Sequence, residues 1–258
     1  MTKIDSNFKY LRVKLRQFGV EISDDVFKRY HPATIIIKKE ICVFCNSTDQ
    51  ITKEHVLPKW IFEKNTETTL ISSVNKQTQT YNKAVIPTCA FCNNSILAQI
   101  ENHIIKVIQR LETCKTYDDI DLKNVIRWLE VLDYKLQVFD CRRKYIKYGE
   151  SEYCSDWGII PISMMRHFID MNPFLAYDFL RKSQRRITVK AKTIENNSLI
   201  IFDTASPHFN FFTQPNEYIF ISFPMNKIAI FLFLKKKFSN SKEATDEAYY
   251  IMKNVFAT

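Results

Sequence analysis

Glycine is nearly absent from this chain of 258 residues, which contains only Gly19, Gly149 and Gly158. A phosphate-binding loop or a dinucleotide-binding turn needs several closely spaced glycines, because its backbone must approach the phosphates. The sequence therefore excludes nucleotide-binding folds built on such loops. Long apolar runs are also missing, since the most hydrophobic run, IAIFLFL over 228–234, is far too short to span a bilayer.

A targeting segment is not expected either. The N-terminal stretch MTKIDSNFKYLRVKLRQFG has no apolar region typical of a signal peptide. We therefore expect a cytoplasmic protein without a membrane partner. In a reducing compartment its seven cysteines are poor candidates for disulfides, so closely spaced pairs are interpreted as metal or redox sites.

The composition is that of a globular protein with a basic surface. Hydrophobic residues make up 46% of the chain and aromatic residues 14%, enough for one large domain or two smaller ones. The formal net charge is +9, which favours a polyanionic partner such as nucleic acid. A basic, solvated surface without such a partner has the same composition, and charge alone does not separate the two.

Two Cys-x-x-Cys pairs predict a structural zinc site. Cys42 and Cys45 form the first pair, and Cys89 and Cys92 repeat the spacing. Two residues between thiolates let a tight turn present both sulfurs to one ion, and two such turns complete a closed tetrahedral site. Reactive or unpaired thiols are the alternative, although a redox motif has no need of a second pair.

The segment between the pairs contains an adjacent Glu and His, in TKEHVLP. With Asn93 directly after the second pair, the order Cys-x-x-Cys, Glu-His-Val-Leu-Pro, Cys-x-x-Cys-Asn resembles the HNH endonuclease superfamily, in its branch with a four-cysteine zinc site. The resemblance covers roughly residues 40 to 112. It implies a ββα-metal module, in which a strand pair carrying Glu54 and His55 packs on a helix that follows the second pair.

The resemblance also implies roles for individual residues. His55 matches the general base that activates water, and Glu54 and Asn93 match ligands of a catalytic Mg²⁺ or Mn²⁺ ion. Lys59 and Lys83 are candidates for phosphate contacts, with solvated lysines as the alternative. The family's middle Asn has no match at the usual spacing, and Asn82 is the nearest candidate.

Elementary chemistry supports these residue types. Imidazole accepts a proton near neutral pH, and oxygen ligands hold a hard cation that offsets charge on a phosphate. Taken singly, each residue also has a structural interpretation: a buried or exposed histidine, a helix cap for Asn93, and a surface ion pair for Glu54. If both Glu54 and His55 lie in a regular strand, their side chains point to opposite faces, so a bulge or a strand end must bring them together.

The remaining chain predicts an α+β fold: a zinc-stapled ββα-metal module with helical segments and a C-terminal antiparallel sheet. Helical periodicity is found over 6–19, 94–113, 121–147, 162–181 with a break near Pro173, and 241–256. Strands are expected at 185–194, 198–203, 217–224 and 227–236. Gly19 is expected to end the first helix.

We expect a basic helical segment over 1–35, the nuclease module over 36–115, and an α+β accessory domain of unassigned role over 116–258. The function expected is that of a metal-dependent endonuclease, a phosphodiester hydrolase acting on DNA, in restriction or antiviral defence by analogy. Two alternatives stay open. One is a non-catalytic, zinc-stabilised nucleic-acid-binding module, and the other is an assembly component whose C-terminal domain forms a homodimer or holds a partner protein.

Overall fold

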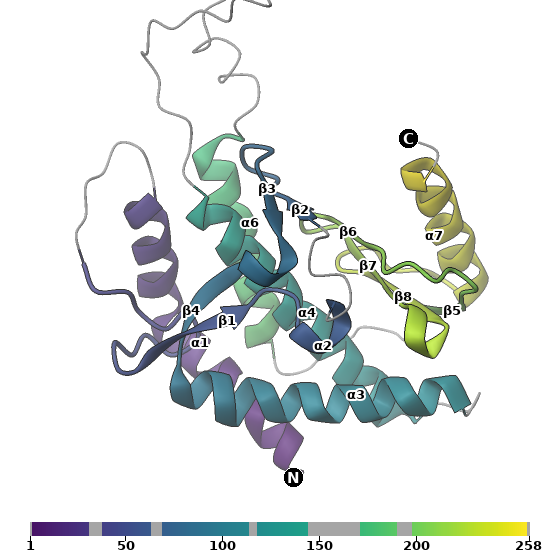
Figure 1. The fold of residues 1–258 in the computed structure, drawn as a ribbon, viewed down its shortest axis with the longest axis horizontal. Helices are drawn as coiled ribbons and strands as arrows, with labels where there is room; N and C mark the ends of the chain where they lie inside the picture. Colours follow the sequence, from purple (N-terminus) through teal and green to yellow (C-terminus); the bar gives the residue numbers. More distant parts are fainter. Residues whose placement is uncertain are drawn as a thin grey trace, which may run out of the picture.

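The fold was analysed in a computed structural model that describes residues 2–30, 38–62, 69–113, 118–143, 171–189 and 198–256. The predicted α+β class is confirmed, because a group of helices is followed by a four-stranded antiparallel sheet (Figure 1). The helices are α1 (Lys3–Tyr30), α2 (Lys59–Phe62), α3 (Ala98–Thr113), α4 (Asp119–Arg142), α6 (Pro173–Thr188) and α7 (Ser241–Phe256). The strands are β1 (Ile51–His55), β2 (Thr69–Ile71), β3 (Thr78–Thr80), β4 (Val85–Cys89), β5 (Leu199–Asp203), β6 (Phe211–Gln214), β7 (Tyr218–Phe223) and β8 (Ile228–Phe233). Short helical turns are η1 (Tyr81–Lys83), η2 (Phe91–Leu97) and η5 (Pro224–Asn226).

Helix α4 lies at the centre of the helical part and packs against α1, α3 and α6. It begins after Asp118, whose carboxylate accepts a hydrogen bond from the backbone N–H of Ile120. The expected buried stripe is present, but apolar residues continue around most of the helix, so polar side chains between them are buried too. Among the described residues, no helix is long and apolar enough to cross a membrane.

Gly19 does not end the first helix, contrary to the sequence prediction, because α1 continues to Tyr30. The reason is a close approach of two helices. A Cβ atom at Gly19 would lie 2.8 Å from the side-chain Cδ of Gln184 in α6. Glycine therefore lies where α6 crosses α1. Its low helix propensity is offset there by the close packing of the two helices.

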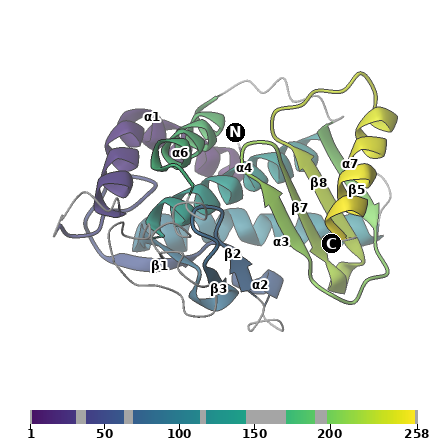
Figure 2. The same ribbon diagram turned by 90° about the horizontal axis from the view of Figure 1, so that it is seen from above.

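The C-terminal sheet has the strand order β5-β8-β7-β6, with antiparallel pairing throughout. Its central strand β8 is buried on both faces, which explains the continuous apolar run in its sequence. Ile228, Ile230 and Leu232 belong to the core shared with the helices, while Phe231 and Phe233 form a second core under α7. Figure 2 shows α7 lying along one side of this sheet.

The predicted strand at 185–194 is wrong for its described part, because Arg185–Thr188 form the last turn of α6. Asn172 caps this helix and Pro173 occupies its first turn, where the fixed φ angle of proline already matches helical geometry. Leu180 and Ile187 then continue a buried helical face. Tertiary packing outweighs the strand preference of the β-branched residues. Residues 190–194 lie outside the described residues, as do the end of the predicted helix 121–147 beyond 143 and the start of the predicted helix 162–181 before 171.

One hydrophobic core joins segments that the sequence assigned to three regions. It contains buried residues of α1, of the strands and helix of the cysteine-containing segment, and of α4, α6, β7 and β8. Trp60 of α2 stacks on Phe223 of β7, with ring centroids 5.7 Å apart, and on Trp128 of α4 at 6.2 Å. The division into separate domains stays a prediction.

Tyr134→Phe is expected to lower the free energy of unfolding by about 1–3 kcal/mol. The fully buried Tyr134 hydroxyl of α4 donates a 2.6 Å hydrogen bond to the carbonyl oxygen of Val43, and phenylalanine would leave this buried acceptor without its donor. Urea unfolding of the two proteins measures the difference. Tyr250→Phe on the exposed face of α7 is the matched control and should unfold like wild type.

Candidate functional site

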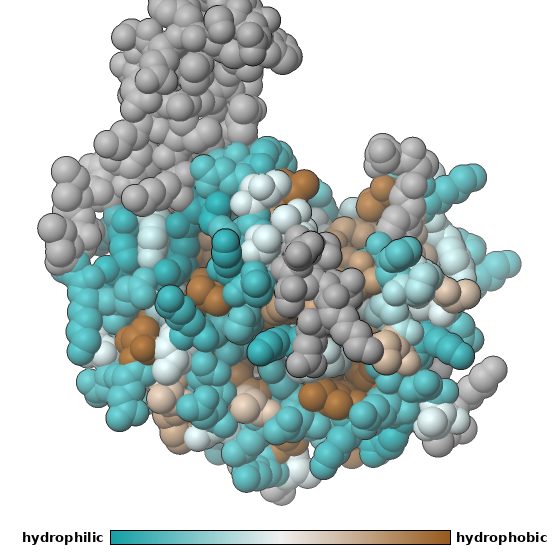
Figure 3. Space-filling view, in the orientation of Figure 1, coloured by the Kyte–Doolittle hydropathy of each residue, from teal (hydrophilic) through white to brown (hydrophobic). Residues whose placement is uncertain are grey.

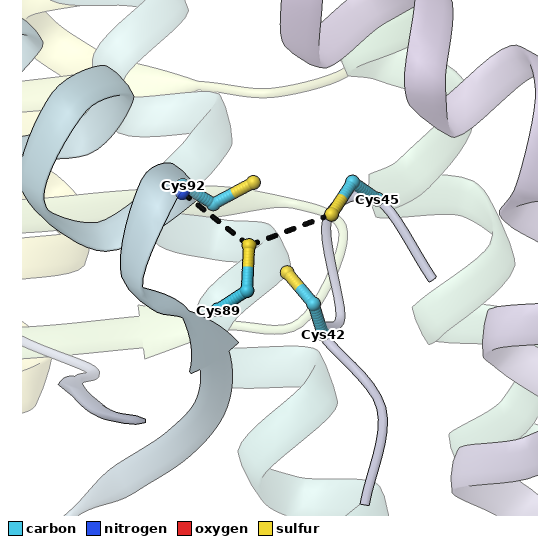
Figure 4. Close-up of side chains that lie close together, drawn as sticks. All are labelled: Cys42, Cys45, Cys89 and Cys92. Carbon is cyan, nitrogen blue, oxygen red and sulfur yellow. Dashed lines mark hydrogen bonds between the residues drawn. The ribbon is translucent and has the colours of Figure 1, made fainter. Parts of the chain in front are cut away.

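The four paired cysteines come together at the point where β4 meets the following helix. Cys42 and Cys45 lie in a turn closed by a 2.9 Å hydrogen bond from the Asn46 N–H to the Cys42 carbonyl. Cys89 is the last residue of β4, and Cys92 lies in the first turn of η2. All four Sγ atoms lie within 4.8 Å of one another (Figure 4), so this group can hold a metal ion, as the sequence predicted.

The sulfur spacing fits a tetrahedral ion better than a disulfide. Cys45 Sγ and Cys89 Sγ are 3.6 Å apart. Zinc–sulfur bonds of about 2.3 Å in a tetrahedron place sulfurs about 3.8 Å apart, whereas a disulfide needs about 2.05 Å. The four cysteines are free thiols in this structure, and Cys42, Cys89 and Cys92 are buried. An ion bound by all four sulfurs would have no open coordination position and would stabilise the fold without taking part in chemistry.

The electrostatics of the four thiols are compatible with a bound cation. Hydrogen bonds from Cys42 and then Cys92 lower the pKa of Cys45 to about 2, so this sulfur is the one that ionises first. Its hydrogen bond with Cys45 raises the pKa of Cys42 to about 12, and the hydrogen bond with Cys42 raises the pKa of Cys92. One thiolate therefore disfavours ionisation of its neighbours, and a bound cation would offset this repulsion between thiolates.

Strands β1 and β4 carry the residues between the cysteine pairs. They pair antiparallel in regular register, with Glu54 opposite Ile86 and His55 opposite Val85. The alternation of the strand sends the Glu54 side chain to the buried face, whereas His55 is half-buried on the other face. The register contains no bulge and His55 is the last residue of β1, so the two side chains stay on opposite faces up to the end of the strand.

On the buried face, Glu54 contacts a lysine that the sequence analysis did not single out. Lys135 Nζ of α4 lies 2.6 Å from Glu54 Oε1 and 3.6 Å from Glu101 Oε1 of α3. The exposed fraction of the side chain is 3% for Lys135, 10% for Glu54 and 20% for Glu101. Two carboxylates from different elements thus share one buried ammonium group.

The charges of this group follow from burial and from each other. Burial raises the pKa of Glu101 to about 7, against the opposing attraction of Lys135 and together with the repulsion of Glu54. For Lys135, burial lowers the pKa, but the two carboxylates more than offset it, so its pKa is raised and the ammonium form persists. The Lys135 ammonium group is therefore the counter-charge of both carboxyl groups.

Asn93 lies in an unusual turn beside this group. The chain enters the helix through a π-turn, in which the N–H of Ala98 donates to the carbonyl of Asn93 five residues earlier. Its Nδ2 donates a 2.9 Å hydrogen bond to Thr52 Oγ1, and Thr52 is two residues before Glu54 on the same face of β1. Because the amide nitrogen is engaged, the amide oxygen is the atom of Asn93 available to a cation.

The other candidate residues lie around the exposed side of the strand pair. The ring of His55 is 5.8 Å from that of Phe62, which closes one side of the imidazole. Lys59 and Lys83 are exposed, on the two segments that adjoin His55 and its partner Val85. Asn82 is exposed and accepts a 2.7 Å hydrogen bond from the Thr80 hydroxyl, so its contact is local to the turn.

Lys135 was missed by sequence reasoning, although one signal could have found it. The run VIRWLEVLDYKLQVF in α4 has apolar residues on nearly every side of the helix. Such a helix is buried all round, so its charged residues must have buried partners. The sequence could not tell which partners, because Glu54 and Glu101 come from elements far away along the chain.

Cys92→Ser is expected to abolish metal retention at this site and to lower the midpoint of thermal unfolding strongly, because a closed four-sulfur site contributes folding free energy. Metal content of the purified protein, together with calorimetric unfolding, measures both effects. Cys141→Ala is the matched control, since Cys141 is buried elsewhere, donating to the Ala176 carbonyl, and its loss should leave the metal content unchanged. Equal metal content in both variants would contradict the assignment.

No protein-family model, curated protein or solved structure matches this chain. A function must therefore be argued from the cysteine cluster, the strand pair and the buried charges described above.

Proposed function

We propose that this protein is a metal-dependent endonuclease of the HNH type that hydrolyses phosphodiester bonds in DNA. The observation that carries the proposal is the ββα arrangement around the cysteine cluster. The β1–β4 pair leads directly into η2 and α3, and this connection brings Glu54 and Asn93 to one side of the strands. The cysteine site holds the strand pair and the helix in this arrangement, with zinc as the ion that suits four sulfurs.

The donors on the buried face fit a catalytic Mg²⁺ or Mn²⁺ ion. Glu54 offers its second carboxylate oxygen, since Oε1 is bonded to Lys135, and Asn93 offers its amide oxygen. Oxygen ligands of this kind are those that hard divalent ions prefer. When bound, the ion supplies positive charge to the scissile phosphate and to the leaving oxygen.

His55 is proposed as the general base. A neutral imidazole takes a proton from water near neutral pH, and a half-buried ring at a strand end can be reached by a large substrate. Phe62 restricts the ring on one side, which orients it. Lys59 and Lys83, both exposed and adjoining this strand end, are proposed to contact phosphates of the nucleic acid.

The surface and the charge support a polyanionic substrate. The face that carries β1 and α3 in Figure 1 is mostly hydrophilic, with small separate hydrophobic patches (Figure 3). Together with the net charge of +9, such a face is better suited to contact with a sugar-phosphate backbone than to burial against another protein. DNA, a cytoplasmic setting and a role in restriction or antiviral defence are proposed by analogy with the HNH superfamily.

A second candidate function is a zinc-stabilised nucleic-acid-binding module without catalysis. The observation that favours it is that Glu54 and Asn93 both have structural contacts. Glu54 binds Lys135, and Asn93 binds Thr52, so neither residue needs an ion to account for its place in the fold. The two candidates share the cysteine site and the net positive charge and differ only in the use of His55 and the oxygen donors.

His55→Ala is expected to reduce cleavage of supercoiled plasmid DNA by about 10²–10⁴-fold in the presence of Mn²⁺ or Mg²⁺, the usual contribution of a general base. Within the described residues, His55 contacts the ring of Phe62 and makes no hydrogen bond, so the thermal midpoint and cysteine-bound metal should stay as in wild type. The initial rate of conversion of supercoiled to nicked or linear plasmid is the measurement.

His208→Ala provides the matched control, because His208 is an exposed histidine in the loop between β5 and β6. It should cleave at the wild-type rate. Equal cleavage by the His55 and His208 variants would contradict the assignment of the base. Binding of labelled DNA without cleavage by wild type would favour the non-catalytic module.

A further inference from the structure

Lys135 is the most unusual charged residue in the described part of the chain. Its side chain is 3% exposed, and it reaches from α4 between a strand and a second helix. Lysine is almost never fully buried unless it is paired, because removing an ammonium group from water carries a large free-energy cost. Here the pairing partners are Glu54 on β1, a ligand in the proposed ion site, and Glu101 on α3.

The two carboxylates need a cation whether or not the protein binds a divalent ion. Two ionised carboxylates in a buried site repel each other, and a nearby positive charge removes most of that repulsion. An ammonium group supplies one positive charge, and a divalent ion supplies two. The same pair of carboxylates can therefore be neutralised from within the chain, by Lys135, or more completely by an ion from solution.

Lys135 and a divalent ion would compete for these oxygens. Glu54 Oε1 already accepts a 2.6 Å hydrogen bond from Nζ, a short contact typical of a charge-assisted bond. An ion held by the carboxylates of Glu54 and Glu101 would lie only a few ångströms from the ammonium group, and at that distance two positive charges repel strongly in a buried site. Whether the ion displaces Lys135 or leaves it in place therefore directly affects the affinity of the site for the ion.

We infer that Lys135 is the internal counter-cation of the Glu54 and Glu101 carboxylates, and that it sets how tightly these two carboxylates hold a divalent ion. Lys135 is a positioning residue, since it acts through Glu54 and Glu101 and not on the substrate. Glu101 becomes a further ligand of the ion site. The inference rests on the proposed function for the location of the ion, but it concerns binding and not the chemical step.

The test uses the full chain, purified with its cysteine-bound metal, and titrates it with Mn²⁺ while the free ion is followed by electron paramagnetic resonance. Lys135→Met removes the ammonium group and keeps a flexible apolar side chain. At a pH of about 8, above the Glu101 pKa of about 7, this variant is expected to bind Mn²⁺ at least about tenfold more tightly than wild type, because a buried like charge has been removed.

Lys242→Met is the control for the change in net charge. Lys242 is exposed on α7, and its loss removes the same unit charge far from the carboxylates in the chain, so Mn²⁺ affinity should stay at the wild-type value. A Lys135→Met variant that binds Mn²⁺ no more tightly than Lys242→Met would overturn the inference.

Two further variants keep the inference testable if Lys135→Met fails to fold. Glu101→Gln leaves the Glu54–Lys135 contact in place and is expected to weaken Mn²⁺ binding about tenfold, since one charged ligand is lost. Lys135→Arg keeps the positive charge and should bind Mn²⁺ as wild type does. Unchanged affinity in Glu101→Gln, or tighter binding in Lys135→Arg, would contradict the assigned roles.

Failure of this inference can be told apart from failure of the proposed function. If the Mn²⁺ affinity changes as expected in the Lys135 and Glu101 variants but wild type does not cleave DNA, the ion site is supported and the nuclease proposal is wrong. If cleavage depends on His55 but Mn²⁺ affinity is the same in all the variants, the nuclease stands and the role of Lys135 is wrong.

Discussion

The convergence of four sulfur atoms is the constraint on which the rest of the site depends. Cys42 and Cys45 approach from a loop, Cys89 ends a strand and Cys92 opens a helix, so one bound ion would fix three elements at once. The ion would also fix the direction in which the chain leaves β4. The π-turn that starts at Phe91 then aims Asn93 toward the face of β1 that carries Thr52 and Glu54. The cysteine cluster and the candidate oxygen ligands are thus separate sites, linked by a few residues of backbone.

Helix α4 is the second organising element, and it acts through buried polar groups as well as through its apolar faces. Tyr134 binds the carbonyl of Val43 in the first cysteine loop, and Lys135 binds Glu54 and Glu101 in the candidate ion site. Asp133, fully buried, pairs with Arg186 of α6. Each of these polar contacts is directional, so together they fix how α4 is rotated against its neighbours in a way that apolar packing alone does not. The part of the chain that follows the cysteine segment therefore shapes the site as much as the segment itself.

The placement of Glu54 and His55 bears on how such a site could work. Neighbouring residues in a regular strand point to opposite faces, which keeps the half-buried imidazole apart from the buried carboxylate and its ammonium partner. A substrate reaching both would have to approach at the end of β1. The Glu54 carboxylate is held on the inner side by Lys135 of α4, which also contacts Glu101 of α3, whereas the described contact of the imidazole on the outer side is with the ring of Phe62. The inner half of the site is therefore the more rigid one.

The sequence alone determined the features that depend on local spacing. The Cys-x-x-Cys pairs predicted the sulfur cluster. Helical periodicity predicted the bounds of α7 and a helical segment that contains α3, and the apolar runs predicted β5, β7 and β8. Only the tertiary structure decided the features that depend on contacts between distant segments. The crossing of α6 explains Gly19, packing of α6 places Arg185–Thr188 in a helix, and the fold of α4 onto the strand pair brings Lys135 to Glu54. Local preferences are encoded by neighbours along the chain, whereas a buried charge acquires its partner only when remote elements pack together.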